Sequence, residues 1–370
     1  MKKSSKIFAV LFCLTVLIQP LPVEAIADSA QSVILMDAGS GRILFERNAH
    51  QPRMIASITK LMTALVALNS EHDISEVVTI KPEWVGAEGS SIYLRSGEQL
   101  QLKTLLYGLM LQSGNDAALA VAGYCEENVD AFVQKMNKTA AELGMNETHF
   151  CNPSGLTEEE HFSSAYDMAL LARACLKHPI LSEIVATKAI SLEGRSFRNH
   201  NKLLWQYEGC IGLKTGYTEK AGRTLVSAAQ RNGLTLICVT LHAPNDWQDH
   251  KELLDYGFTN YQNMYPYEQS AIIGVLPVYG SLIPVCPIQV KDSLAFAIRE
   301  DECVEVQIHL DGSVLEAPVA KNVPVGKISY RLNGEEITGT QIITAADIPD
   351  NLLRERNWFE AMLGKISFEK

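Results

Sequence analysis

The first residues that could do chemistry together are Ser57 and Lys60, in the segment Ser57-Ile58-Thr59-Lys60. On a helix, residues three apart lie on one face, so the serine hydroxyl and the lysine amine would be neighbours. A buried lysine has a lowered pKa, and its neutral amine can take the proton of a serine nucleophile. Ser-x-x-Lys alone is a weak motif, because an N-capping serine followed by a surface lysine also explains it. The pair is, however, surrounded by apolar residues, which predicts that it is buried or lies in a cleft: Ile55, Ala56, Ile58, Leu61 and Met62.

A second motif, Ser113-Gly114-Asn115, lies in a predicted turn between two helices. Serine, glycine and asparagine are common at helix caps and turns, so a structural role explains this motif when it is taken alone. In a reactive site, its hydroxyl would relay a proton and its carboxamide would hold a substrate amide.

A third motif, Lys214-Thr215-Gly216, begins a predicted strand. An ordinary strand start would account for these residues. A lysine and a threonine hydroxyl at a strand edge, however, form a receptor for a carboxylate. Gly216 has no side chain, so a substrate backbone could lie against the strand.

The order of the three motifs is more specific than any one of them. On a helix, a helix–helix turn and a strand respectively, they form the signature of the penicillin-binding and serine β-lactamase superfamily. The chain closely resembles the low-molecular-weight D-alanyl-D-alanine carboxypeptidases, serine peptidase family S11, over nearly all of its length after residue 25, including the segments Ala56–Thr63, Leu111–Ala118, Asn152–Leu156 and Gly212–Thr218. The resemblance implies an α+β fold: a β-lactamase/transpeptidase-like catalytic domain with an antiparallel sheet and helices, a small all-β domain and a C-terminal amphipathic helix.

The resemblance also implies catalytic roles. Ser57 would attack the carbonyl of the penultimate D-Ala of a peptidoglycan stem peptide, with Lys60 as general base. Ser113 would help to return the proton to the leaving amine. The backbone N–H groups of Ser57 and Tyr217 would form the oxyanion hole. The reaction would need no metal or organic cofactor.

The remaining motif residues are implied to bind the substrate, a stem peptide that ends in D-Ala-D-Ala. Asn115 would hold the peptide, and Lys214 and Thr215 would bind its terminal carboxylate. Gly216, which lacks a side chain, would let the peptide backbone lie against the strand. β-Lactam antibiotics mimic D-Ala-D-Ala and would acylate the serine as covalent inhibitors. Removal of the terminal D-alanine limits the donors for cross-linking, which implies a role in cell-wall maturation and cell shape.

Two alternatives remain open at this point. A class A β-lactamase carries a Glu-x-x-x-Asn element after the Ser-x-Asn motif, but Thr148–Gly155 contains no glutamate and Glu158–Glu160 have no suitably spaced asparagine. A non-catalytic wall-associated scaffold would be expected to lack Ser57 or Lys60. One position departs from the family pattern, because His200 stands where several relatives have a carboxylate-binding arginine.

Hydrophobic periodicity predicts the elements that must position these residues. Ser32–Asp37 with Arg42–Glu46 predicts one hairpin, and Thr224–Gln230 with Leu234–Thr240 predicts another with an Asn-Gly turn. Helices are predicted between the hairpins at Ile55–Leu68, Lys103–Gln112, Asp116–Glu127, Val129–Leu143 and Tyr166–Leu176. This order predicts one antiparallel sheet, built from both ends of the domain, with helices packed against it.

The chain divides into four predicted parts. Residues 1–25 resemble a secretory signal peptide, with three lysines, a short apolar run and the cleavage site Val23-Glu24-Ala25. The apolar run is too short for the ~20 residues of a transmembrane helix, so we expect export to the outer face of the cytoplasmic membrane or the cell-wall space. A catalytic domain (residues 26–265) and a small β-domain (residues 266–345) follow. Residues 346–370 predict an amphipathic helix for peripheral membrane contact, with docking on the protein itself as the alternative.

Composition excludes other classes of protein. A chain of 370 residues with 47% hydrophobic and 20% charged residues is a folded protein of about two domains. Its formal charge of −11, which cleavage after Ala25 would lower to −13, argues against nucleic-acid binding. Seven cysteines would remain after cleavage, without Cys-x-x-Cys or metal-ligand spacing, so most are expected to be buried fillers like Cys175 and Cys238. Lys60 and Lys214 would have to attract a carboxylate locally, against this overall charge.

Overall fold

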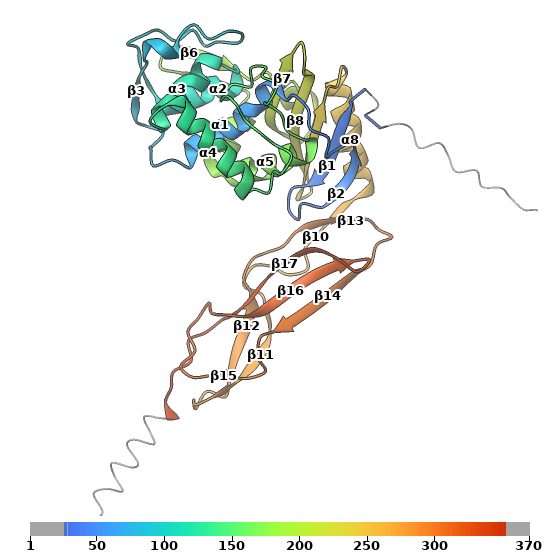
Figure 1. Cartoon of the computed structure of the whole chain (residues 1–370). Helices are drawn as coiled ribbons and strands as arrows, with labels where there is room; N and C mark the ends of the chain where they lie inside the picture. The colour runs from blue at the N-terminus through green and yellow to red at the C-terminus, as the bar shows by residue number, and fades with distance from the viewer. Residues whose placement is uncertain (1–25, 28, 353–370) are drawn as a thin grey trace, which may run out of the picture.

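The computed structural model describes residues 26–27 and 29–352, which form a larger domain of helices and strands and an elongated β-domain beyond it (Figure 1). The predicted signal peptide and residues 353–370 of the predicted C-terminal helix lie outside the described residues. The prediction of a helix from residue 346 is wrong for residues 346–351, which are not helical, because Ile348 is buried and forms a β-bridge with Val319. Within the described part, no helix is long and apolar enough to cross a membrane.

An antiparallel sheet of five strands, in the order β2-β1-β9-β8-β7, forms the centre of the first domain. Strands β1 (Ser32–Asp37) and β2 (Ile43–Arg47) form the first predicted hairpin, and β8 (Gly222–Arg231) and β9 (Leu234–Leu241) form the second. Because β1 pairs with β9, both ends of the domain share one sheet, as the sequence predicts. β7 (Cys210–Thr218), which carries Lys-Thr-Gly, pairs with β8 at the edge of this sheet.

Alternating side chains of the sheet enter two separate cores. Ile34 and Met36 pack into a core with the helical block, whereas Val33 and Leu35 enter a second core on the opposite face. The helical block comprises α1 (Lys60–Leu68), α2 (Leu102–Leu111), α3 (Asn115–Cys125), α4 (Val129–Glu142), α5 (Ala165–Lys177) and α6 (Pro179–Ala186). The second core is closed by α8 (Asp246–Asn260) and the short α7 (Leu203–Gln206).

The predicted helix at Ile55–Leu68 begins differently from the prediction. A 3-10 turn, η1 (Ala56–Thr59), comes first, and α1 begins only at Lys60. Ala56 has a φ of 51°, a left-handed conformation that no α-helix accommodates. The bend therefore separates Ser57 from the helix, although it leaves the spacing of three residues to Lys60 intact.

Short elements complete the first domain. Two small antiparallel pairs join β3 (Val77–Thr79) with β4 (Gln99–Gln101) and β5 (Ala189–Leu192) with β6 (Arg195–Arg198). A 3-10 turn, η2 (Pro82–Trp84), begins the loop that leads toward Ser90.

The second domain contains strands and no helix between residues 266 and 345, all of which are described, in agreement with the sequence prediction. Six strands form one sheet in the order β14-β16-β17-β12-β11-β15. They are β11 (Ile272–Tyr279), β12 (Val285–Val290), β14 (Val304–Leu310), β15 (Leu315–Glu316), β16 (Pro324–Leu332) and β17 (Glu335–Thr344).

The two domains are joined through the turn between β1 and β2. At the junction, β10 (Gln262–Met264) pairs with β13 (Phe296–Ile298). The Asp37 carboxylate accepts the Ala297 N–H at 3.1 Å, and the Arg42 guanidinium donates to Glu302 at 2.8 Å. The N-terminal hairpin of the first domain is thereby tied to the base of the second.

Candidate active site

Ser57 is partly exposed by a strained turn at the start of a buried helix. Unlike its neighbours on both sides, it is not buried. The two carbonyl groups before it are held in place, because Thr224 Oγ1 donates to Ile55 O at 2.9 Å and Thr59 Oγ1 donates to Ala56 O at 2.8 Å. The left-handed conformation of Ala56 costs a non-glycine residue roughly 1–3 kcal/mol. These hydrogen bonds maintain a turn that presents the Ser57 hydroxyl.

The Lys60 amine lies next to this hydroxyl and is completely buried. Its Nζ is 3.1 Å from Ser57 Oγ. Burial lowers the pKa of Lys60 well below its ordinary value, the positive charge of Lys214 lowers it further, and the Asp116 carboxylate acts in the opposite direction. Burial and the charge of Lys214 both favour the neutral amine, the form that can act as a base.

The other contacts of Lys60 aim its lone pair. Nζ lies 2.6 Å from Asn115 Oδ1 and 2.5 Å from the carbonyl oxygen of Ser154, and both oxygens can only accept hydrogen bonds. A neutral amine has two hydrogens and one lone pair. Because the two hydrogens meet these oxygens, the lone pair faces the third neighbour, the Ser57 hydroxyl.

Asn115 and Asp116, at the start of α3, hold a loop across the site. Asn115 Nδ2 donates to Glu88 O at 2.5 Å, and the backbone N–H of Asn115 donates to Ser90 O at 2.7 Å. The Asp116 carboxylate accepts from Ser91 Oγ at 2.6 Å and from two backbone N–H groups of the same loop at 3.0 Å each. Since the Nδ2 end of the carboxamide is tied to this loop, its Oδ1 end faces the buried amine.

Lys214 is the second buried lysine of the site, with 1% of its surface exposed. Its Nζ donates to the carbonyl oxygen of Thr215 at 2.8 Å. Burial lowers the pKa of Lys214 to about 7. A carboxylate bound near it would favour the ammonium form, so the charge of Lys214 depends on the presence of an anion.

Gly216 has a packing role that the sequence analysis did not foresee. A Cβ at this position would lie 2.4 Å from Thr224 Oγ1 and 3.0 Å from the backbone nitrogen of Ser57. The space beside the glycine is thus filled by the protein itself rather than left open for a substrate. The missing side chain lets η1 lie against β7, which brings the Ser57 N–H next to the strand that carries Tyr217.

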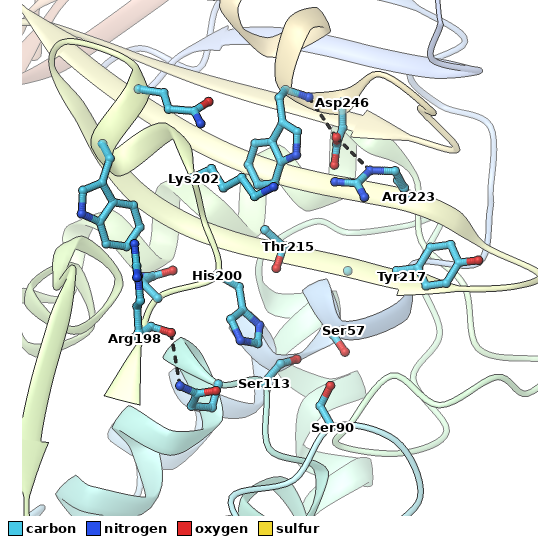
Figure 2. A pocket seen from close by; sticks show the side chains of 16 residues that line it. Ser57, Ser90, Ser113, Arg198, His200, Lys202, Thr215, Tyr217, Arg223 and Asp246 are labelled. Atoms are coloured by element: carbon cyan, nitrogen blue, oxygen red, sulfur yellow. Dashed lines mark hydrogen bonds and ion pairs between the residues drawn. The ribbon is translucent and has the colours of Figure 1, made fainter. Parts of the chain in front are cut away.

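Ser57 lies where two cavities meet. The first has a volume of about 860 Å³, and its lining includes Ser57, Ser90, Ser113, Thr215, Gly216 and Tyr217. The second has a volume of about 620 Å³, and its lining includes Ser57, Ser90, Asn115, Ser154, Leu156 and Tyr217. Figure 2 shows the side chains of Ser57, Ser90 and Ser113 converging at the edge of the first cavity. The structure thus brings six of the eight predicted site residues to the cavity walls, and the two buried lysines lie beneath the lining.

Several basic residues border the first cavity. His200 is joined there by Arg198, Lys202 and Arg223 (Figure 2). Burial and the nearby charge of Lys214 lower the pKa of His200 below its ordinary 6.5, so its imidazole is mainly neutral at pH 7. The positive charge of this wall therefore comes from the two arginines and Lys202.

His161 was missed by sequence reasoning, although it supports the nucleophile turn. Its Nδ1 accepts the backbone N–H of Cys151 at 3.1 Å, so Nε2 carries the hydrogen and donates to Thr59 Oγ1 at 2.8 Å. Thr59 in turn donates to the strained Ala56 carbonyl. Burial lowers the pKa of His161 to about 4, which keeps the imidazole neutral. A single histidine in a loop gives no sequence signal for this role.

Two further expectations from the sequence concern the loop Glu158–Glu160 and the cysteines. Glu158, Glu159 and Glu160 are exposed and line neither cavity, as expected for a solvated loop. All seven described cysteines are free, and four of them are buried, including Cys175 and Cys238. In the described part of the chain, no group of three or more His, Cys, Asp or Glu side chains could hold a metal ion.

Comparisons with known proteins identify the family of the chain. Residues 20–245 match the D-alanyl-D-alanine carboxypeptidase family (peptidase S11), and residues 261–350 match the C-terminal domain of penicillin-binding protein 5. The chain is 29% identical to D-alanyl-D-alanine carboxypeptidase DacF of Bacillus subtilis, over 87% of each chain. It is 32% identical to DacA of Escherichia coli, over 87% of this chain and 84% of that protein.

Solved structures are similar as well. Penicillin-binding protein 5 from Haemophilus influenzae matches with a TM-score of 0.74 and 30% identity, over 87% of this chain and 98% of that one. Penicillin-binding protein 6B from Escherichia coli matches with a TM-score of 0.67 and 27% identity, over 87% and 96%. The motifs, the fold and these relatives agree, and the chain belongs to the serine D-alanyl-D-alanine carboxypeptidases of peptidase family S11.

Proposed function

We propose that this chain removes the terminal D-alanine from peptidoglycan stem pentapeptides through an acyl-enzyme on Ser57. The observation that carries the proposal is the position of the Lys60 amine, which is buried and lies 3.1 Å from Ser57 Oγ, while its other two neighbours, Asn115 Oδ1 and Ser154 O, are hydrogen-bond acceptors. Lys60 takes the hydroxyl proton as Ser57 Oγ attacks the carbonyl carbon of the penultimate D-alanine.

The negative charge that develops on the carbonyl oxygen needs hydrogen-bond donors. The backbone N–H groups of Ser57 and Tyr217 serve as these donors in our proposal. The close packing of η1 on β7 at Gly216 supports this pairing. Loss of one such donor typically lowers kcat by about 10²- to 10³-fold, so the pair is a major part of catalysis.

The terminal carboxylate of the substrate is bound beside β7. Thr215 lines the first cavity and offers its hydroxyl, while the buried Lys214 supplies positive charge from beneath. This pair explains why the substrate must end in a free carboxylate. β7 is an edge strand, so the peptide can lie along it as an additional strand.

The reaction ends with departure of D-alanine and hydrolysis of the ester. Ser113 borders the first cavity and delivers the proton to the leaving amine. Asn115 holds Lys60 through Oδ1, and the second hydrogen on Nδ2 is available to a peptide carbonyl. Water then attacks the acyl-enzyme and releases the shortened peptide.

Penicillins are proposed as covalent inhibitors, and their reaction separates this function from its alternatives. A fluorescent penicillin should label the wild-type protein stably on a denaturing gel, and Ser57→Ala should not be labelled. Label released within seconds would favour a β-lactamase, and the absence of label on the wild type would favour a scaffold. The exposed positions of Glu158–Glu160 support the carboxypeptidase, because no carboxylate of that loop is placed to drive fast deacylation.

The location of the substrate indicates where in the cell the reaction takes place. Stem peptides lie outside the cytoplasmic membrane, so we propose that residues 1–25 direct export and that residues 353–370 make a peripheral contact with the outer face of the cytoplasmic membrane. Trimming of pentapeptides there would limit cross-linking and so contribute to wall maturation.

A further inference from the structure

Apolar side chains are exposed at the end of the β-domain that lies away from the first domain. The turn between β11 and β12 presents Leu282 and Ile283, which are 56% and 41% exposed. Tyr279, at the end of β11, and Val314, in the loop before β15, are exposed as well. Contiguous apolar side chains on a protein surface mark a contact with another protein or with a membrane.

The segments that carry these side chains lie next to one another. β11 and β15 pair in parallel, and the Ala317 N–H donates to the carbonyl oxygen of Tyr279 at 2.8 Å. Ser281, in the turn, donates from Oγ to Asn351 Oδ1 at 3.1 Å. Figure 1 shows β11 and β15 at the end of the β-domain where the described chain also ends. The exposed turn and the exit of the chain therefore share one end of the molecule.

The hairpin that carries the turn has no charge. Residues 271–290, which include β11, the turn and β12, contain no Asp, Glu, Lys or Arg. The turn can therefore leave water without the cost of desolvating a charged side chain. Glu316, opposite Tyr279 in the β11–β15 pair, is exposed and limits how deep this end can enter an apolar medium. Such a distribution suits a shallow contact, with Tyr279 at the level of lipid head groups and the turn below it.

The exit of the chain favours a membrane over a protein as the partner of this surface. Leu352 follows Asn351 directly and is exposed, and residues 353–370 are the proposed membrane contact. Because Ser281 is hydrogen-bonded to Asn351, a membrane that contacts residue 353 lies beside the turn as well. The apolar turn would then be covered by the same lipid surface.

We propose that the turn Gly280–Pro284 enters the head-group region of the membrane that residues 353–370 contact, and so forms a second point of attachment. This inference rests on the proposed membrane contact and extends it to the folded part of the β-domain. Two aliphatic side chains are too few to hold the protein on a bilayer alone, so the turn adds to the contact of residues 353–370. Two attachment points also limit the tilt of the β-domain, to which the catalytic domain is tied through Arg42 and Glu302.

A tryptophan in the turn would report its surroundings. Ile283→Trp is introduced into the full-length chain together with Trp358→Phe, which removes the tryptophan of residues 353–370. Vesicles of phosphatidylcholine and phosphatidylglycerol should shift the emission of the new tryptophan to shorter wavelength. Phospholipids with brominated acyl chains should quench it. Subtraction of the spectrum of the Trp358→Phe parent removes the signal of the tryptophans in the first domain.

Variants of the turn measure its share of the binding. Leu282→Asp with Ile283→Asp should weaken partition onto these vesicles at least about tenfold, because apolar contacts are replaced by charges that resist transfer. Val306→Asp with Ile308→Asp is the matched control, since these side chains are 48% and 52% exposed on β14, at the opposite edge of the sheet from β15. The control should bind within about twofold of wild type. Thermal unfolding followed by circular dichroism verifies that each variant is folded.

The outcomes separate this inference from the proposals on which it depends. None of the measurements uses D-alanine release, so loss of enzymatic activity cannot imitate a negative result. Failure of the wild type to bind vesicles would overturn the proposed membrane contact itself. Vesicle binding without quenching of the Ile283→Trp signal, or binding of the turn variant equal to wild type, would leave that contact intact and overturn the inference. Emission of Ile283→Trp that is already shifted without vesicles would also overturn it, because residues 353–370 or a second copy would then cover the turn.

Discussion

Lys60 and Lys214 are both buried, and burial opposes a positive charge on each of them. Their proposed tasks differ nonetheless, because Lys60 would have to be neutral to take a proton, whereas Lys214 would have to be charged to hold a carboxylate. The contacts of Lys60 with Asn115 and Ser154 serve the first task. A bound substrate serves the second, since its carboxylate favours the ammonium form of Lys214.

This difference predicts a pH dependence. As pH rises through about 7, free Lys214 loses its proton, so kcat/KM for a D-Ala-D-Ala peptide should fall. The decline in kcat should come at higher pH, because the bound carboxylate raises the pKa of Lys214. Lys214→Arg retains its charge and should remove the decline near pH 7 even if its activity is lower. A wild-type kcat/KM that stays constant between about pH 6 and 9 would contradict the assigned role.

The lowered pKa of Lys214 also predicts how protein stability depends on pH. The pKa of Lys214 is lower in the folded protein, about 7, than its ordinary 10.5, so the unfolded chain binds more protons between these values. The contribution of Lys214 to stability therefore rises with pH across that window. Lys214→Met should be more stable than wild type in urea unfolding at pH 7, with a smaller advantage near pH 10. A stability advantage of Lys214→Met that grows with pH would contradict the assigned direction of the Lys214 pKa shift.

His161 is expected to act as a positioning residue for the nucleophile turn. His161→Ala removes the donor to Thr59, and it should lower stability by about 1–3 kcal/mol and slow penicillin acylation of Ser57 about tenfold. The shape of the pH–rate profile should not change, because His161 is neutral over the working range. His161→Gln can still donate and should recover part of the acylation rate. A change in the acidic limb of the pH–rate profile of His161→Ala would instead indicate that His161 takes part directly in proton transfer.

Sequence reasoning identified the motif residues but not the residues that hold them. The eight predicted positions carry recognisable types at recognisable spacings, and all lie in or directly beneath the site. Asp116, His161 and the carbonyl of Ser154 act through contacts between distant segments, which no local pattern reveals. Asp116 and Ser154 had a partial signal, since they lie in the segments Leu111–Ala118 and Asn152–Leu156 that carried the family resemblance.

At the scale of elements, the site depends on close approaches between backbones. Gly155 has a φ of +83°, and a Cβ there would lie 2.0 Å from the carbonyl oxygen of Ala56. The loop that supplies the Ser154 carbonyl to Lys60 is thus pressed against the nucleophile turn. Gly216 permits the corresponding approach of β7 from the other side.

Substitution of Gly155 tests this packing. Gly155→Ala combines a left-handed φ with a collision against backbone, so it should slow penicillin acylation at least tenfold and lower the midpoint of thermal unfolding. Gly144→Ala is the matched control, because Gly144 has a similar φ of +77° with nothing within 4 Å of a Cβ. The control should show only the cost of the backbone conformation, about 1 kcal/mol. Equal effects of the two substitutions would refute the importance of the contact.

Elements with strong periodicity were predicted well, and the exceptions have physical reasons. The helices α2 to α5 and both hairpins were recognised from regular apolar patterns: α4 buries one face, whereas α2 and α3 are apolar and buried along nearly their whole length. In α8, the buried positions include Asp246, Asp249 and His250, so an apolar stripe is hard to see. The turn η1 was read as helix because it directly precedes the apolar run of α1, and periodicity does not reveal the positive φ of Ala56.

At the scale of the whole molecule, the β-domain extends away from the first domain and carries the end of the described chain at its far end (Figure 1). If residues 353–370 contact a membrane as proposed, the β-domain would separate the site from that surface. Division into these domains was predictable from the loss of helical periodicity after residue 265. The tie between Arg42 and Glu302 was not, because it joins residues far apart in sequence.

The membrane contact can be tested on the complete chain. Removal of residues 353–370 should abolish co-flotation with lipid vesicles, because the proposed apolar face is lost. D-alanine release in solution should remain within twofold of wild type, since the site lies in the other domain. Unchanged vesicle binding after the truncation would assign the contact to another part of the protein.

The central claim is that Ser57 and Lys60 act as nucleophile and base in D-alanine release. The direct measurement is the rate of D-alanine release from a D-Ala-D-Ala peptide by the wild type, Ser57→Ala and Lys60→Ala. The wild type should turn over, and each variant should lose at least about 10³-fold in kcat. Activity of either variant within tenfold of wild type would contradict the account.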